Sequence, residues 1–65
     1  MNRNVEEIED MLEEAIRLRN EWESHFYSGK LSTKENARAL RNYTALRGVV
    51  KTLKWVKGLP INPLE

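Results

Sequence analysis

The sequence predicts an all-α fold, an antiparallel two-helix hairpin that associates into a four-helix bundle. Two observations indicate the hairpin. Apolar residues recur every three or four positions over two stretches of similar length, and a short connection with a glycine and a capping sequence separates these stretches. A third observation indicates association: the second stretch is apolar or small on almost every side, whereas one partner helix covers only one side.

The first helix is predicted over residues 5–27. Asn4 is a suitable N-cap, with Glu7 at the third helical position, and Gly29 provides a stop signal after the last apolar residue. The apolar positions form a single stripe, and acidic and basic residues occupy the opposite side. This stripe consists of Val5, Ile8, Met11, Leu12, Ala15, Leu18, Trp22 and Phe26.

The second helix is predicted over residues 33–57. Ser32 and Glu35 fit a capping box, in which the serine hydroxyl accepts from a backbone amide and the glutamate reaches back to the cap. Gly58 ends the helix, and Pro60 prevents it from resuming. If the connection centres near Lys30, facing residues have numbers that sum to about 60, which places Ala15 opposite Leu46.

The second helix carries two apolar stripes on opposite sides. The main stripe, which is expected to face the first helix, consists of Ala39, Tyr43, Leu46, Val50 and Leu53, with Leu40, Val49 and Val56 on its flanks. Gly48 lies on the other side and costs roughly 1 kcal/mol relative to alanine in a helix, which favours close approach by another backbone. We call the residues of this other side the second seam and predict that they form a protein interface: Ala37, Thr44, Ala45, Gly48, Thr52 and Trp55.

Charge is distributed unevenly along the chain. Residues 1–27 hold eight acidic and three basic residues, whereas residues 28–65 hold eight basic and two acidic residues. One interpretation is that the two helices face each other. The alternative is a small nucleic-acid-binding regulator whose second helix contacts phosphates, although its basic residues are spread around the helix. The candidate contacts are Arg38, Arg41, Arg47, Lys51 and Lys54.

The composition of the chain limits its size and the kinds of functional site that it can hold. The 65 residues allow one small domain, with a hairpin over residues 1–58 and an extended tail over residues 59–65 that either packs on the hairpin or serves as a docking segment. Cysteine is absent and histidine occurs once, so we expect no disulfide, metal or other cofactor. His25 follows Glu21 by four residues, a spacing that does not match the di-iron motif, and no motif indicates an enzyme.

The expected function is therefore that of a small helical accessory protein that binds protein. No apolar stretch approaches the roughly 20 residues of a membrane span, and the N-terminal region is acidic, so we expect a soluble, cytoplasmic protein. Because a hairpin of this size has a marginal core, self-association into a homodimer through the second helix is the favoured form of assembly.

Overall fold

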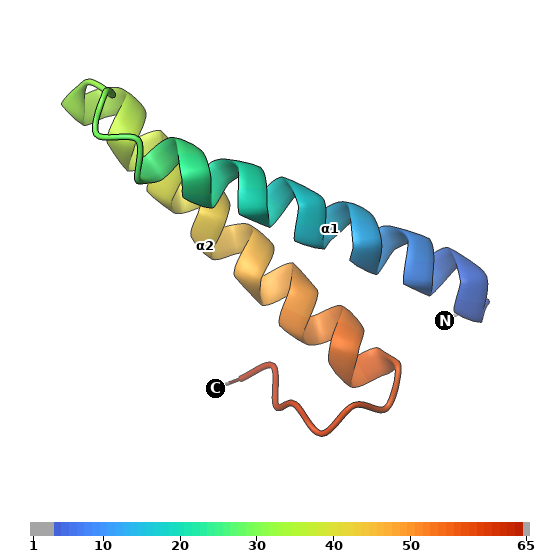
Figure 1. Ribbon diagram of the computed structural model, residues 1–65. Coiled ribbons are helices and arrows are strands. Elements are labelled where there is room, and N and C mark those ends of the chain that lie inside the picture. The colour runs from blue at the N-terminus through green and yellow to red at the C-terminus, as the bar shows by residue number, and fades with distance from the viewer. Residues whose placement is uncertain (1–3, 65) are drawn as a thin grey trace.

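The computed structural model describes residues 4–64, so residues 1–3 and 65 of the two predicted units lie outside the described part. Two helices, α1 (Val5–Phe26) and α2 (Thr33–Val56), pack against each other as an antiparallel hairpin (Figure 1). Residues 4–64 contain no strand. The predicted all-α hairpin is thereby confirmed, and each helix is one residue shorter at its C-terminal end than predicted.

Both predicted N-caps are present. The Asn4 side chain accepts from the amide of Glu7 at 2.9 Å, and the Ser32 hydroxyl accepts from the amide of Glu35 at 3.2 Å. Both capping residues have extended backbone, so each side chain satisfies one of the amides that the first turn of a helix leaves unpaired.

The helix ends follow from two glycines. Gly29 and Gly58 have φ angles of 72° and 88°, in the left-handed region that side chains with a Cβ rarely adopt. Tyr27 and Lys57 are the C-caps that precede them. The chain therefore leaves the helical conformation at the positions that the glycines predict.

The core between the helices is small. In the described part of the chain, the buried apolar residues are Leu12 and Ala15 of α1 and Ala39 and Val50 of α2, each with at most 7% of its surface exposed. Ile16 and Leu53 pack against this cluster. All of these residues except Ile16 belong to the predicted stripes of the two helices, and most other members of those stripes are only half-buried.

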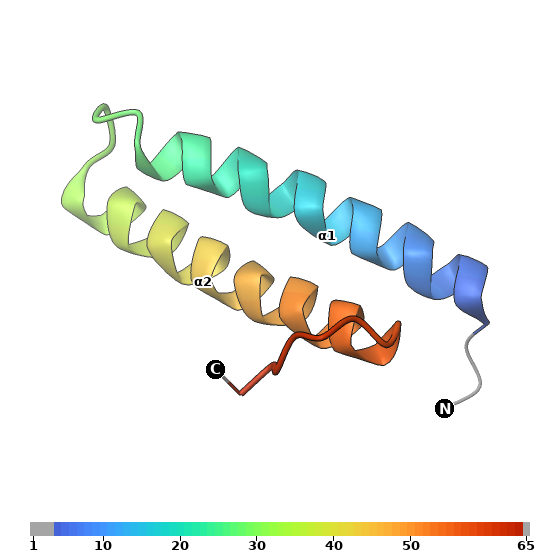
Figure 2. The same cartoon turned by 60° about the horizontal axis from the view of Figure 1, so that its bottom comes forward.

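The register of the hairpin differs from the prediction. Glu9 contacts Lys57 and Glu23 contacts Tyr43, whereas the expected register placed Leu18 opposite Tyr43. The first turns of α2 extend past the end of α1, and the start of α1 extends past the end of α2 (Figures 1 and 2). The connection, residues 27–32, runs outward from the end of α1 to the first turn of α2, which projects beyond α1. The residue pairs that face each other are therefore not arranged symmetrically about the middle of the connection.

The tail turns back at Gly58 and runs along α2, on the side away from α1 (Figures 1 and 2). The amide of Leu59 donates to the carbonyl of Lys54 at 3.0 Å, and the amide of Leu64 donates to the Asn62 side chain at 2.9 Å. The tail is non-helical, and Ile61 and Pro63 are half-buried. Of the two predicted arrangements, the tail therefore adopts the one that packs on the hairpin.

Within residues 4–64, neither helix combines the length and the apolar character that crossing a membrane requires.

Candidate interaction surfaces

The second seam lies on the surface of α2 that is opposite α1. All six of its residues are exposed, and 58% of the Trp55 surface is accessible. A Cβ placed on Gly48 would meet no atom within 4 Å, apart from its immediate surroundings in the helix. Close packing against another part of the hairpin therefore does not explain why residue 48 is a glycine. The Thr52 hydroxyl donates to the Gly48 carbonyl at 2.9 Å, so this polar group is satisfied within the helix.

The tail lies beside the second seam. Pro63 and Leu64 border a hollow whose other walls are Thr44, Gly48 and the basic side chains of Arg47 and Lys51. A second hollow lies between Trp55 and the tail residues, Leu59, Pro60, Ile61 and Asn62. From the sequence, packing of the tail is one alternative for Trp55, beside burial in a subunit interface and contact with a ligand. In the structure the tail flanks both the glycine and the tryptophan of the seam.

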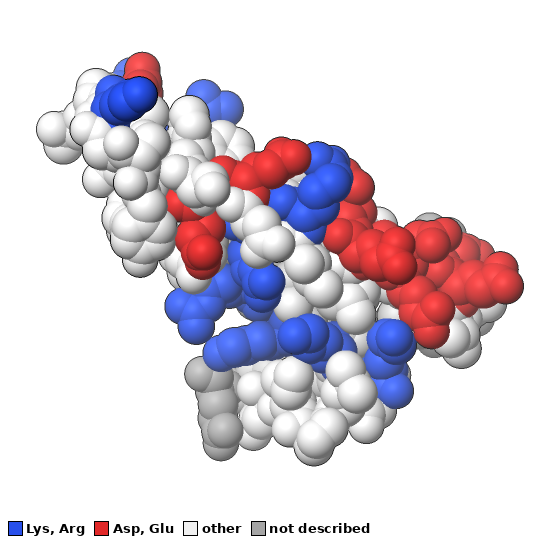
Figure 3. Space-filling view, in the orientation of Figure 1, with Lys and Arg blue, Asp and Glu red and all other residues white. Residues whose placement is uncertain are grey.

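The five basic residues considered for nucleic-acid contact differ in exposure and in contacts, and two of them, Arg47 and Lys51, border the same hollow. Arg38 and Arg41 are exposed, whereas Lys51 and Lys54 are half-buried. Arg47 lies over the ring of Tyr43, 5.8 Å from the ring centre, in a cation–π arrangement. Figure 3 shows acidic side chains along α1 next to basic side chains along α2 on one face of the molecule. A nucleic acid that approached this face would meet both charges.

An ion-pair ladder lies along the outside of α1. Arg17 donates to both carboxylate oxygens of Glu14 and to Glu21, the latter at 2.5 Å. The hydrogen bond from Arg17 lowers the pKa of the Glu14 carboxyl below its ordinary value and raises the pKa of the guanidinium. Such pairs between residues three or four positions apart support an exposed helix.

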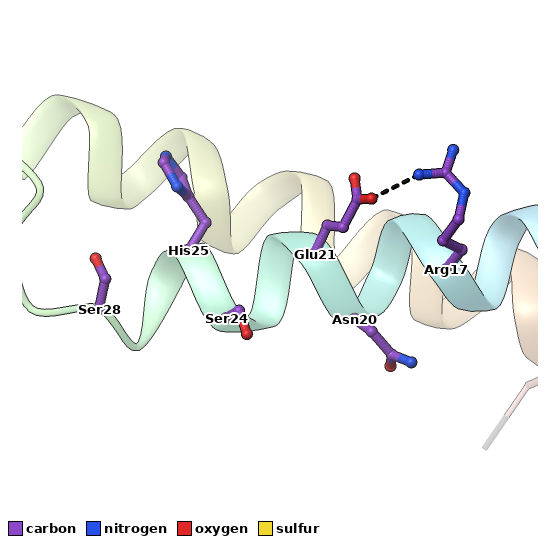
Figure 4. A pocket seen from close by; sticks show the side chains of 6 residues that line it. All are labelled: Arg17, Asn20, Glu21, Ser24, His25 and Ser28. Carbon is purple, nitrogen blue, oxygen red and sulfur yellow. Dashed lines mark hydrogen bonds and ion pairs between the residues drawn. The ribbon is translucent and has the colours of Figure 1, made fainter.

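A shallow polar hollow continues from this ladder towards the connection (Figure 4). Its lining residues all come from α1 and the connection, and all are exposed: Arg17, Asn20, Glu21, Ser24, His25 and Ser28. His25 packs edge-on against Trp22, with the ring centres 5.6 Å apart. Among the described residues, no group of three or more histidine, aspartate or glutamate side chains is placed to hold a metal ion. Glu21 is the one carboxylate among the lining residues, and it is exposed.

The two long sides of the hairpin differ in character. The contacts Glu9–Lys57, Glu23–Tyr43 and Arg47–Tyr43 lie along one side and make it polar. With about 100° between successive residues of a helix, the sequence places apolar residues of both helices, together with the half-buried Asn42, on the opposite side. We call this surface the side face; its members are Met11, Leu18, Trp22, Leu46, Val49, Leu53 and Val56.

The side face is only partly covered by the hairpin itself. Met11 and Val49 are 56% and 42% exposed, and the other five members are half-buried. A hollow bordered by Glu21 and His25 adjoins Trp22 at one end of this surface. The sequence analysis did not predict the side face, because it paired the two helices only along the stripes that face each other. Its signal was present in the spacing of Met11 and Leu18 and of Val49 and Val56, seven residues in each case.

Comparison of the chain with models of protein families, with curated proteins and with solved structures found no match. The interpretation of these surfaces therefore depends on their own residues.

Proposed function

We propose that this protein is a small helical interaction module that completes its hydrophobic core by binding another helical surface, in the first place that of a second copy. The observation that carries the proposal is the imbalance between buried and exposed apolar side chains. Four described apolar residues are buried, two of them alanines. Among residues 4–64, eight large apolar residues are exposed: Val5, Met11, Tyr27, Leu40, Val49, Trp55, Leu59 and Leu64.

This imbalance favours a binding partner for energetic reasons. Burial of apolar surface contributes about 25 cal/mol per Å² and has to offset a loss of chain entropy of roughly 1 to 2 kcal/mol per ordered residue. A hairpin that buries two alanines, one leucine and one valine gains little from its own core. Binding a second apolar surface adds the missing burial, and contiguous apolar surfaces are typical of interaction sites.

Self-association agrees with the shape and charge of the chain. A hairpin with apolar residues beyond its own core is the building unit of dimeric four-helix bundles. The acidic α1 and the basic α2 also give each copy both signs of charge, so two copies attract in a suitable orientation. The second seam, with Ala37, Gly48 and Trp55, and the side face are the two surfaces available for this contact.

The test is the molar mass in solution over a concentration series, measured by light scattering and by sedimentation equilibrium. We expect the mass to rise from that of the monomer to that of the dimer between low and high micromolar concentration. The monomer mass at every concentration would contradict self-association. Helicity measured over the same series separates folding of the hairpin from its association, because an associating hairpin gains stability as concentration rises.

A further inference from the structure

The hollow beside Gly48 lies between α2 and the end of the tail. We call it the tail hollow; its border consists of Thr44, Arg47, Gly48, Lys51, Pro63 and Leu64. We infer that the tail hollow binds the phosphate group of a small phosphorylated molecule. This inference goes beyond the proposed function and does not depend on self-association.

Helical spacing places four residues of the tail hollow on one face of α2. Arg47, Gly48 and Lys51 follow Thr44 by three, four and seven positions, and residues at these intervals share a face of a helix. The hydroxyl and both basic side chains therefore start from positions around Gly48. A Cβ on this glycine would meet no atom within 4 Å, apart from its immediate surroundings in the helix. A ligand can thus approach the helix backbone between the two cations.

The positive charges of the tail hollow are not neutralised within the described chain. Among residues 4–64, no ion pair joins Arg47 or Lys51 to a carboxylate, whereas Lys57 pairs with Glu9. Lys51 is also half-buried. Because charges interact more strongly where water has limited access, an anion in the tail hollow gains more from this ammonium group than from a fully exposed one.

An aromatic ring holds the guanidinium of Arg47 in place. The central carbon of the guanidinium lies 5.8 Å from the centre of the Tyr43 ring. The Tyr43 hydroxyl in turn bonds to Glu23 of α1, so the ring is connected to both helices. A cation–π contact orients the guanidinium without neutralising its charge. Arg47 therefore loses less side-chain freedom when it binds an anion than an unrestrained arginine would.

The donors of the tail hollow match a phosphate better than a carboxylate. A phosphate monoester carries a charge of about −1.5 to −2 at neutral pH and three oxygens that accept hydrogen bonds. Arg47 and Lys51 supply two positive charges, and the Thr44 hydroxyl, which has no hydrogen-bond partner among residues 4–64, supplies a third donor. A guanidinium binds two phosphate oxygens at once, and an ammonium group binds as a compact charge.

The tail favours a small ligand with an apolar part. Pro63 and Leu64 complete the border of the tail hollow, so an apolar group attached to the phosphate has a surface to contact. A long polyanion would extend beyond the hollow towards the acidic side chains of α1, which lie next to the basic ones in Figure 3. These two features favour a small phosphorylated molecule over a nucleic acid.

Nuclear magnetic resonance titration of the full chain tests the site. The probes are phenyl phosphate, inorganic phosphate and benzoate, each exchanged for sodium chloride at constant ionic strength. We expect phenyl phosphate to cause saturable shifts of the backbone amides of residues 44–51, with a dissociation constant of roughly 1 mM or lower. Inorganic phosphate should bind more weakly because it lacks the apolar ring, and benzoate more weakly because it carries a single charge. Equal affinities for phenyl phosphate and benzoate would overturn the assignment to phosphate.

Two lysines of α2 provide a matched comparison. Lys51 and Lys54 are both half-buried, but only Lys51 borders the tail hollow. We expect Lys51→Gln to raise the dissociation constant for phenyl phosphate roughly tenfold, because it removes a charged donor, and Lys54→Gln to change it less than about threefold. Arg47→Gln should weaken binding to a similar extent as Lys51→Gln. Circular dichroism checks that each variant retains its helicity.

Two results would overturn the inference. Shifts that grow without saturation, or equal weakening in Lys51→Gln and Lys54→Gln, would show a general attraction of anions to α2 and no site in the tail hollow. Neither result affects the proposed function, which the molar mass of the wild-type protein tests separately.

Discussion

The ammonium nitrogen of Lys57 lies 3.5 Å from Oε1 of Glu9, so an ion pair joins the end of α2 to the second turn of α1. Each charge also lies near a helix end of opposite sign, because an N-terminus is partly positive and a C-terminus partly negative. The pair thus connects the acidic part of one helix to the basic part of the other, at the end of the hairpin away from the connection.

Removing this ion pair has a small, salt-dependent effect. Because Glu9 is 48% exposed and Lys57 is 30% exposed, Glu9→Gln is expected to lower the free energy of unfolding by about 0.2 to 1 kcal/mol. Urea denaturation at fixed protein concentration measures this change. The difference from wild type should shrink in high salt, which screens exposed charges. A loss that persists unchanged in high salt would indicate packing of the Glu9 side chain rather than its charge.

Shortening the largest fully buried side chain has a greater effect. Val50 is 2% exposed, and Val50→Ala removes two buried carbons at about 0.8 kcal/mol each and leaves a cavity, so we expect a loss of about 2 kcal/mol or more. Val5→Ala makes the same chemical change at a position that is 65% exposed and should cost much less. Equal melting temperatures for the two variants would show that Val50 is not part of the core.

The start of α2 depends on one side-chain hydrogen bond. Ser32→Ala removes the acceptor of the Glu35 amide and is expected to cost about 1 kcal/mol, whereas Ser32→Asp keeps an acceptor and should retain most of the stability. Ser24→Ala, at an exposed position inside α1, is the control and should be neutral or slightly stabilising because alanine is the better helix former. Thermal denaturation followed by circular dichroism measures all three variants. Equal losses for alanine and aspartate at Ser32 would exclude a capping role.

Local features of the fold were predictable from the sequence, whereas features that depend on packing were not. The caps at Asn4 and Ser32 and the stop at Gly29 each need only a few neighbouring residues, so their residue types determine them. The register requires the path of residues 27–32, which no local rule fixes. The expected register therefore failed, although the apolar stripes included every core residue except Ile16.

The candidate surfaces also include one feature that was predictable from the sequence and others that depend on packing. The sequence predicted an apolar or small surface opposite the main stripe of α2, and the residues of the second seam lie there. It did not predict that Pro63 would border the hollow beside Gly48, because contact between a tail and a helix depends on the three-dimensional path of the chain. The side face also required both helices to be in place, since Met11 and Val49 are 38 positions apart in the sequence.

The ionisation of Tyr43 links stability to alkaline pH. A hydrogen bond to Glu23, together with desolvation and the glutamate charge, raises the pKa of the Tyr43 hydroxyl above its ordinary value, although Arg47 opposes this shift. The protonated phenol is therefore favoured in the folded state. Its contribution to stability is complete below the pKa of tyrosine in the unfolded chain, about 10, and is lost as pH rises through the higher pKa of the folded state.

Spectrophotometric titration of the tyrosines tests this assignment. Glu23→Ala removes both the hydrogen bond and the charge, so the Tyr43 pKa should fall towards its ordinary value. Tyr43→Phe, which leaves Tyr27 as the sole tyrosine, identifies the signal that belongs to each residue. An unchanged titration in Glu23→Ala would show that the contact between Tyr43 and Glu23 is not formed in solution.

Nucleic-acid binding is expected to be weak and non-specific at physiological salt. Contacts to phosphates through Arg38, Arg41, Arg47, Lys51 and Lys54 would release counterions, so affinity would fall steeply as salt increases. The Arg47 guanidinium already packs on Tyr43, and acidic side chains of α1 lie beside the basic ones on the face shown in Figure 3. Fluorescence anisotropy with labelled single-stranded and duplex DNA and RNA over a salt series measures the affinity.

Charge reversal separates this weak attraction from a true binding site. Arg41→Glu combined with Arg47→Glu should abolish the low-salt binding and leave the side-face residues Met11 and Val49 unchanged. Submicromolar binding by the wild-type protein at physiological salt, lost in this double variant, would contradict the expectation and favour the nucleic-acid-binding regulator. The same double variant retains the apolar side face. Its dimer dissociation constant, measured on the same preparation, therefore shows whether assembly and nucleic-acid binding use different residues.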